Sequence, residues 1–502
     1  MSQKQKTAAT PFAATIDCLA RTDNAAASAV LLAALDSPHL EVQDGALDAI
    51  MVRRSLVCQR EIIRRFDTVS ERWLDILNER RGRMTQALRD ALLSHDEHLC
   101  RNACAAILRF SEFDLMSTLV NAAEDEANPL ADLAATTLLS LADLLYAELH
   151  NPRDYKLRRD PQMVRRNIAV SLEESVKRFP KHQRREPLEA FLLLAGRENS
   201  ALMQILCDPR HPSYLAVIQT LQTTERLGIM RLILSYLDDP QSPTSLVSVI
   251  AHRADQRFIE LLLRKIGREP TAGARTNLRH VTSIAWLKEG PQLLDQLDDA
   301  GQHSALQLVL ATGMKNADQF AIVQYLAMYG NAGGRRAAAE SLTGFTGVEA
   351  NQLIQRCLQD PDPLVKAAAL NLLRPRSISG ALATLIKFLD DEHPAVRKAA
   401  QQNLPEYAFA RFVASFETLD EAIRDTTAKL VLKADPQAIA SLRQEMRSNS
   451  GKRRLRALAI ARTMKVCDTV EDALLLSLED PDHLVRVEAA ISLGECHSAK
   501  AQ

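Results

Sequence analysis

Turn-forming and aromatic residues are scarce in this sequence. Its 502 residues include 17 glycines and 20 prolines, and aromatic residues make up 4% of the chain. All-β folds need many turns, which depend on glycine and proline, so the composition disfavours them. With few aromatic side chains, the core has to be built from Leu, Ile, Val and Ala. The abundant Ala, Leu and Arg favour helices.

Several signals of special environments are also missing. No run of about 18 uninterrupted apolar residues occurs, so we expect no membrane insertion. The segment from Met1 to Ala20 has no sustained apolar run and contains Asp17, so we expect no signal peptide. The eight cysteines are scattered, which indicates reduced thiols and a cytoplasmic protein. The net charge of −1 gives no overall bias toward nucleic acid or membrane.

An internal repeat is the informative feature. Its clearest copies span residues 360–370, 391–401 and 480–490. Each copy has an acidic turn, a Val, a cation and an Ala four residues after the Val. In the first copy, Val365, Ala369 and Leu373 are spaced by four, which places them on one face of a helix. The preceding Asp and Pro mark a turn and the start of that helix.

Weaker copies extend the repeat over much of the chain. Val365 and Val396 are 31 residues apart, and six consecutive C-terminal units begin their second helices at similar intervals. The equivalent positions in these six units are Gly334, Val365, Val396, Ile423, Leu455 and Val485. Similar patterns occur at Val42, Cys100 and Leu130. A second apolar helix precedes each one, so a unit is helix, turn, helix, and only stacked units can bury both apolar faces.

This pattern resembles HEAT repeats of the ARM-type superfamily, in the short variety named after the phycobilisome lyases. The resemblance implies an all-α fold, an α-solenoid or superhelix of stacked helix-turn-helix units. It covers the C-terminal third best and the N-terminal part less well. We predict a flexible N-terminus (1–22), N-terminal repeats (23–150), diverged helical repeats (151–329), regular repeats (330–496) and a tail (497–502).

Charge is polarised in one place. Residues 111–151 contain eight acids and no Lys or Arg, whereas residues 153–185 contain eleven Lys or Arg against four acids. One hypothesis is a surface for an anion or an acidic partner. The alternative is that helical pairs such as Glu173–Lys177 and the neighbouring acidic segment neutralise it. The cations without an obvious local partner are Arg158, Arg159, Arg165, Arg166, Lys181, Arg184 and Arg185.

Two further sets of cations have an ordinary interpretation. One follows the Val positions of the repeat: Arg335, Lys366, Arg397, Arg424, Arg456 and Arg486. Stacked in register, they could track a phosphate backbone, but the resemblance to HEAT repeats implies pairing with a turn Asp of the same or a neighbouring unit. The second set lies in Gly330–Arg336, which could hold an anion at a helix start but falls where a repeat turn belongs.

Catalytic signatures are not found. The motifs GxGxxG, GxSxG, HExxH and CxxC are all missing. His95, His98, Cys100 and Cys104 are close in sequence, but the two cysteines fill core positions of a repeat, so we expect packing and not a metal. No catalytic residue, metal or cofactor is predicted.

The sequence thus favours a non-catalytic scaffold or adaptor that binds another protein, of unknown identity, through the solenoid surface. The alternative is a solenoid that binds nucleic acid or phosphate through residues 153–185. A second alternative is an enzyme of the HEAT-like lyase type, although no functional residue of that group can be matched here.

Overall fold

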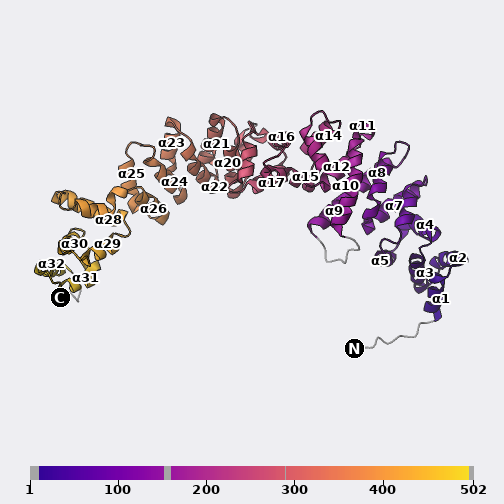
Figure 1. Cartoon of the computed structure of the whole chain (residues 1–502), viewed down its shortest axis with the longest axis horizontal. Coiled ribbons are helices and arrows are strands. Elements are labelled where there is room, and N and C mark those ends of the chain that lie inside the picture. The colour runs from indigo at the N-terminus through magenta and orange to yellow at the C-terminus, as the bar shows by residue number, and fades with distance from the viewer. Residues whose placement is uncertain (1–10, 152–159, 289, 497–502) are drawn as a thin grey trace. The chain divides into compact units, whose positions relative to one another are not determined.

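The computed structural model describes residues 11–151, 160–288 and 290–496. Within these ranges the chain forms helices and no strands, and 75% of it is helical. Helix follows helix with short connections throughout (Figure 1). The prediction of an all-α solenoid is confirmed.

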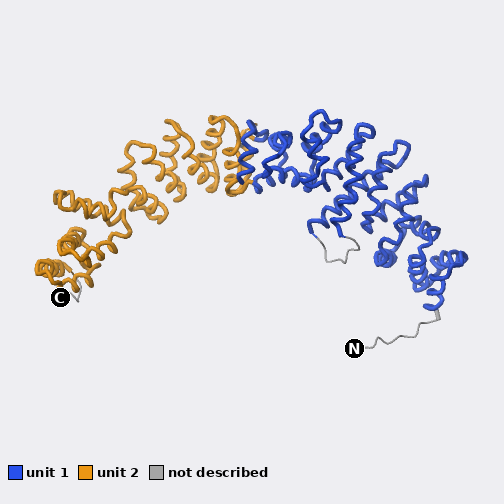
Figure 2. The backbone as a smooth tube through the Cα atoms, viewed as in Figure 1, with its two compact units in different colours: residues 1–265, 271–286 blue, residues 266–270, 287–502 orange. Residues whose placement is uncertain are grey.

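The chain folds as two compact units (Figure 2). Unit 1 comprises residues 1–265 and 271–286, and unit 2 comprises residues 266–270 and 287–502. The short helix α19, Ala285–Lys288, spans the division.

Unit 1 holds eighteen α-helices within its described residues. They are α1 (Pro11–Arg21), α2 (Ala26–Leu35), α3 (Leu40–Arg53), α4 (Leu56–Arg64), α5 (Glu71–Glu79), α6 (Thr85–Leu92), α7 (Glu97–Phe110), α8 (Met116–Glu124), α9 (Ala131–His150), α10 (Pro161–Lys177), α11 (Phe179–His182), α12 (Arg185–Leu194), α13 (Ser200–Cys207), α14 (Tyr214–Thr223), α15 (Leu227–Ser235), α16 (Thr244–His252), α17 (Gln256–Ile266) and α18 (Ala272–Leu278). Helices two apart in the chain pack together, as α8 with α10 and α10 with α12 do. This is the stacking that a repeat array requires.

Within the segment 1–22, for which we predict a flexible stretch, the described residues Pro11–Arg21 form α1, which packs against α3. Gly45 explains the close approach of the two helices. A Cβ there would lie 3.3 Å from side-chain atoms of both Phe12 and Ile16. These two apolar residues, four apart on one face of α1, give the helix a surface to bury.

Unit 2 holds the regular repeats. Its helices are α20 (Asp299–Ala311), α21 (Asn316–Tyr329), α22 (Ala332–Ser341), α23 (Val348–Cys357), α24 (Pro363–Leu373), α25 (Ala381–Lys387), α26 (Pro394–Gln402), α27 (Phe409–Ser415), α28 (Glu421–Ala434), α29 (Ala438–Met446), α30 (Gly451–Thr463), α31 (Glu471–Ser477) and α32 (His483–Leu493). The second helices of successive units pack on one another, for example α22 with α24 and α24 with α26. A continuous apolar core links α27 to α32.

The predicted core register holds in the clearest repeats. Ala369, Ala400 and Ala489 are completely buried, as their positions in the repeat require. In α30 the register was wrong by two residues. The buried alanines there are Ala457 and Ala461, whereas the predicted Ala459 is only partly buried.

Candidate functional site

The repeat cations are used mainly inside the stack. Arg335 donates from Nε and Nη2 to the Asp360 carboxylate, at 2.8 and 3.3 Å, and from Nη1 to the Gly330 carbonyl at 2.9 Å. It thus joins its own turn to the turn of the next unit. Bidentate arginine–carboxylate contacts of this kind are strong and directional. The pairing that the resemblance implied is therefore confirmed for this unit.

A second contact of this kind, which we call an Arg–Asp staple, is made by a residue two positions before the expected one. Arg454, and not Arg456, donates from Nε and Nη2 to the Asp480 carboxylate, both at 2.7 Å. This bond lowers the pKa of Asp480. Arg397 bonds instead to carbonyls of its own turn, those of Asp391 and Glu392. These contacts do not leave a free ladder of charge for a phosphate backbone.

The glycine-rich segment Gly330–Arg336 is a packing device. The Gly333 amide donates to Asp299 at 3.2 Å, and Arg336 pairs with Asp362 at 2.6 Å. A Cβ at Gly334 would overlap Gln302, so glycine here permits α22 to approach α20 closely. The segment is a repeat turn, as its sequence position indicated.

The predicted basic stretch is partly neutralised by the acidic segment before it. Arg184 pairs with Asp132, and Arg178 pairs with Glu124 at 2.8 Å. Arg184, which has no obvious local partner in the sequence, thus pairs with a residue 52 positions earlier. Lys181 and Arg185 are exposed and make no ion pair with any described residue. Arg158 and Arg159 lie outside the described residues.

Arg165 and Arg166 contribute instead to a groove of about 900 Å³ within unit 1. Each of three helices presents one face to it, through residues spaced by three and four. The lining residues are Tyr146, Leu149 and His150 from α9; Gln162, Arg165, Arg166 and Ala169 from α10; and Gly228, Arg231, Leu232 and Ser235 from α15. The end of α12 and the loop after it, residues 193–199, complete the wall.

Four arginines and one carboxylate, Glu198, carry the charge of the groove. Arg166 and Arg231 are exposed and have no ion-pair partner among the described residues. Arg197 lies 3.7 Å from Asp239, a loose contact at a half-exposed site. Because the cations outnumber the carboxylates, the groove carries a positive potential that favours an anionic group.

Hydrogen bonds hold the wall of the groove in place beside Arg165 and Arg197. Arg165 donates from Nε to the Leu194 carbonyl at 2.7 Å, which satisfies a carbonyl at the C-terminal end of α12. The buried Tyr236 donates its hydroxyl to the Arg197 carbonyl at 2.9 Å and so fixes the loop. A Cβ at Gly196 would lie 2.6 Å from Arg165 Nη2, so glycine leaves room for that guanidinium.

Tyr146 and Gly228 shape the inner end of the groove. The Tyr146 ring stacks on His150, with centroids 4.0 Å apart, and His150 Nδ1 donates to the Tyr146 carbonyl at 2.9 Å. A Cβ on Gly228 would lie 2.9 Å from the Tyr146 ring and overlap Leu193. Glycine thus allows α15 to approach α9 and α12.

Sequence reasoning found half of the groove's arginines. It singled out Arg165 and Arg166 but missed Arg197 and Arg231, which lie 32 and 66 residues after Arg165. It also grouped Lys181, Arg184 and Arg185 with them, yet these residues lie at the opposite end of α12, roughly 13 Å away along a ten-residue helix. The signal it could have used is the matching set of i, i+3, i+4 and i+7 residues on α10 and α15.

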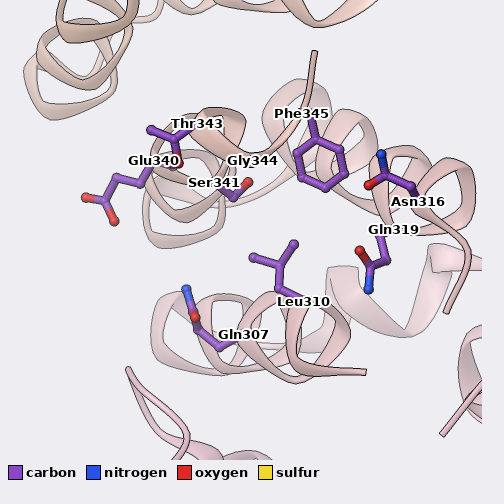
Figure 3. Close-up of a pocket in the computed structure, with 9 residues that line it drawn as sticks. All are labelled: Gln307, Leu310, Asn316, Gln319, Glu340, Ser341, Thr343, Gly344 and Phe345. Carbon is purple, nitrogen blue, oxygen red and sulfur yellow. Dashed lines mark hydrogen bonds between the residues drawn. The ribbon is translucent and has the colours of Figure 1, made fainter. Parts of the chain in front are cut away.

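Unit 2 has a hollow of about 430 Å³ beside the end of α20 (Figure 3). Figure 3 shows Gln307 and Leu310 on one side and Ser341 and Phe345 on the other. Among the described residues that line it, Glu340 alone is charged. Its amides include Gln319, which already donates to carbonyls at the end of α20. The hollow therefore offers little for recognition of a charged ligand.

Cys100 and Cys104 are buried in α7, as packing residues would be. His98 pairs with Asp67 at 3.1 Å, on the exposed surface. Within the described residues, no three His, Cys, Asp or Glu side chains are placed to hold a metal ion. The same part of the chain contains no helix with the length and apolarity to cross a bilayer.

Comparison with known proteins identifies one family. The HEAT-repeat family model matches residues 321–405 and 350–440. No curated protein matches the sequence.

Three of the solved structures that match this chain share little sequence with it. An engineered protein is 15% identical, with a TM-score of 0.17 over 94% of this chain and 99% of its own. Kap95p, in its complex with RanGDP, is 13% identical with a TM-score of 0.29, over 97% of this chain and 77% of its own. A Kap121p mutant is 11% identical with a TM-score of 0.20, and the match covers 96% of this chain but about half, 52%, of Kap121p.

Proposed function

Because this chain is a HEAT-repeat protein, we propose that it is a non-catalytic scaffold that binds a protein partner through its solenoid surface. The observation that carries this proposal is the use of the repeat cations within the stack. Arg335 and Arg454 are held by Asp360 and Asp480, so these two described repeat positions do not offer the free charge that a nucleic-acid backbone needs. An extended stack of helices instead exposes a large surface suited to another polypeptide.

Affinity purification of the tagged full chain from its native cell tests this function. The purification is run with nuclease and at two salt concentrations, after chemical cross-linking. We expect a reproducible protein partner whose cross-links map to exposed helix positions of the repeats. Because protein contacts depend less on counterion release than phosphate contacts do, the partner should persist at the higher salt.

Binding of labelled RNA and DNA across an ionic-strength series tests the rival role. Neutralisation of several phosphates makes affinity fall steeply with salt. Tight nucleic-acid binding with a steep salt slope, and no protein partner that survives nuclease, would contradict the scaffold proposal.

A further inference from the structure

In the arginine groove of unit 1, Arg166 and Arg231 have no ion-pair partner among the described residues. We infer that the groove binds an acidic segment of a protein partner, one in which Asp or Glu alternates with apolar side chains. The inference rests on the proposed scaffold function and adds the chemistry of the partner. Its residues come from α9, α10, α15 and the loop after α12, so the site depends on the stacking of several repeats.

Charge complementarity identifies the polar half of the ligand. Arg166 and Arg231 project from two different helices and have no carboxylate partner among the residues described. Arginine presents a planar fork that matches a carboxylate with two parallel hydrogen bonds.

The apolar surface between the arginines identifies the apolar half of the ligand. Leu149, Leu193, Leu194 and Leu232 line the groove along with the cations. Pockets of this size, between about 300 and 1,000 Å³, commonly combine an apolar lining with a few placed polar groups. Leu193, Leu194 and Leu232 are buried in the wall, so the leucine surface open to a ligand is that of the partly exposed Leu149. A ligand made only of phosphates would leave this surface against water, whereas an acidic segment with an apolar residue would cover it.

Tyr146 argues against a single-stranded nucleic acid as the ligand. Such ligands stack their bases on free aromatic faces. The Tyr146 ring is already stacked on His150 and closely approached by Gly228. Among the described residues, no other aromatic side chain lines the groove. The described part of the groove thus has the cations of a nucleic-acid site without its stacking platform.

Fluorescence anisotropy with the full chain tests the inference. The probe is a fluorescein-labelled peptide with two copies of Ser-Glu-Leu-Glu-Ser, compared with versions in which Lys replaces Glu or Ser replaces Leu. A 12-nucleotide single-stranded DNA is the rival ligand. We expect binding of the acidic peptide, at least about tenfold weaker binding of the Ser-for-Leu version, and none of the Lys version.

A pair of double variants assigns the binding to the groove. Arg166→Glu/Arg231→Glu should weaken the acidic peptide by at least about tenfold. Lys181→Glu/Arg185→Glu makes the same charge change on exposed cations outside the groove and should weaken it by less than about twofold, the screened effect of distant charges. Circular dichroism melts of both variants establish that the helices remain folded.

Equal weakening in the two variants would overturn the inference, because it would show a non-specific charge effect. Absence of peptide binding to the wild-type chain, or tighter binding of the DNA, would overturn it as well. The scaffold role has a separate outcome. If Arg166→Glu/Arg231→Glu captures the same native partner as the wild type, the groove assignment fails and the scaffold function stands.

Discussion

The substitution Ala400→Glu tests the stacking of the repeats through the loss of stability that a buried charged side chain should cause. Ala400 is fully buried in α26, the helix that packs against α24 on one side and α28 on the other. A larger side chain in a well-packed contact costs about 1–3 kcal/mol. A buried carboxylate adds to this until it takes up a proton. At pH 7, protonation of a carboxyl whose ordinary pKa is about 4.3 limits that penalty to about 4 kcal/mol. The total is therefore about 5–7 kcal/mol if the site stays rigid.

The same change should depend on pH in a defined direction. Burial raises the pKa of the introduced Glu above its unfolded value, so the native state binds a proton more readily than the unfolded state. The protonation cost at pH 5 is about 1 kcal/mol. The destabilisation should thus shrink as the pH falls from 7 to 5, because the penalty exists only where the unfolded state is ionised.

Limited proteolysis and circular dichroism provide the assay. In a quasi-one-dimensional array, damage spreads mainly to adjacent units, so cleavage should begin near residue 400 and leave a resistant fragment that contains unit 1. Ala383→Glu is the matched control, because Ala383 is exposed in α25 of the same repeat. Wild-type behaviour of Ala400→Glu would refute the buried register, and simultaneous loss of both units would refute the repeat-by-repeat account.

Three other perturbations follow from the structure. Asp480→Asn should destabilise unit 2 by about 1.5–3 kcal/mol at pH 7, the usual value of a hydrogen bond to a charged group. The pKa of Asp480 is lowered by its bond with Arg454, so this contribution is fully present above the unfolded pKa and is lost as pH falls through the folded value. Urea unfolding at pH 7 and pH 3 should therefore show a smaller difference between variant and wild type in acid, and a constant difference would contradict the pairing. Gly228→Ala should destabilise unit 1 by about 1–3 kcal/mol in thermal melts, because the new Cβ overlaps Leu193. The control Gly344→Ala should change the stability little, because a Cβ there has no atom within 4 Å. Equal melting temperatures of Gly228→Ala and the wild type would show that α15 is not packed as closely as described. Thiol titration of the native protein should show two rapidly modified thiols, since Cys18 and Cys207 are exposed. Burial raises the pKa of Cys357 and of Cys467 to about 11, so both should be modified slowly until denaturant is added. Rapid modification of all eight thiols would argue against the described core.

The all-α solenoid could be predicted from the sequence because the same spacing of apolar residues recurs in successive units and so indicates which residues face the core. Val365, Ala369 and Leu373 recur with the same spacing in other units, and each copy supports the next. The register failed in α30, where Arg453, Arg454 and Arg456 lie together. Several arginines can occupy the cation position there, and only the direction of the side chains shows that Arg454 reaches Asp480.

The groove was only partly predictable for a different reason. Arg165 and Arg166 stand in a visibly basic stretch, so composition reveals them. Arg197 and Arg231 are isolated cations in ordinary surroundings, and only the stacking of α10 and α15 brings them to one place. Conversely, Arg184 looked unpaired because its partner, Asp132, lies 52 residues earlier in the chain.

The Arg–Asp staples have a mechanical consequence. Arg424 occupies the same helix position as Arg335, but the next turn has Ser448 where Asp360 stands in the earlier unit. Its Nε is buried without a hydrogen-bond partner, and its guanidinium lies over the Phe416 ring, 4.5 Å from the centroid. A chain under load yields first where adjacent segments are joined least tightly. Stretched from its ends, unit 2 would therefore part between α28 and α30 before it parts at the stapled turns.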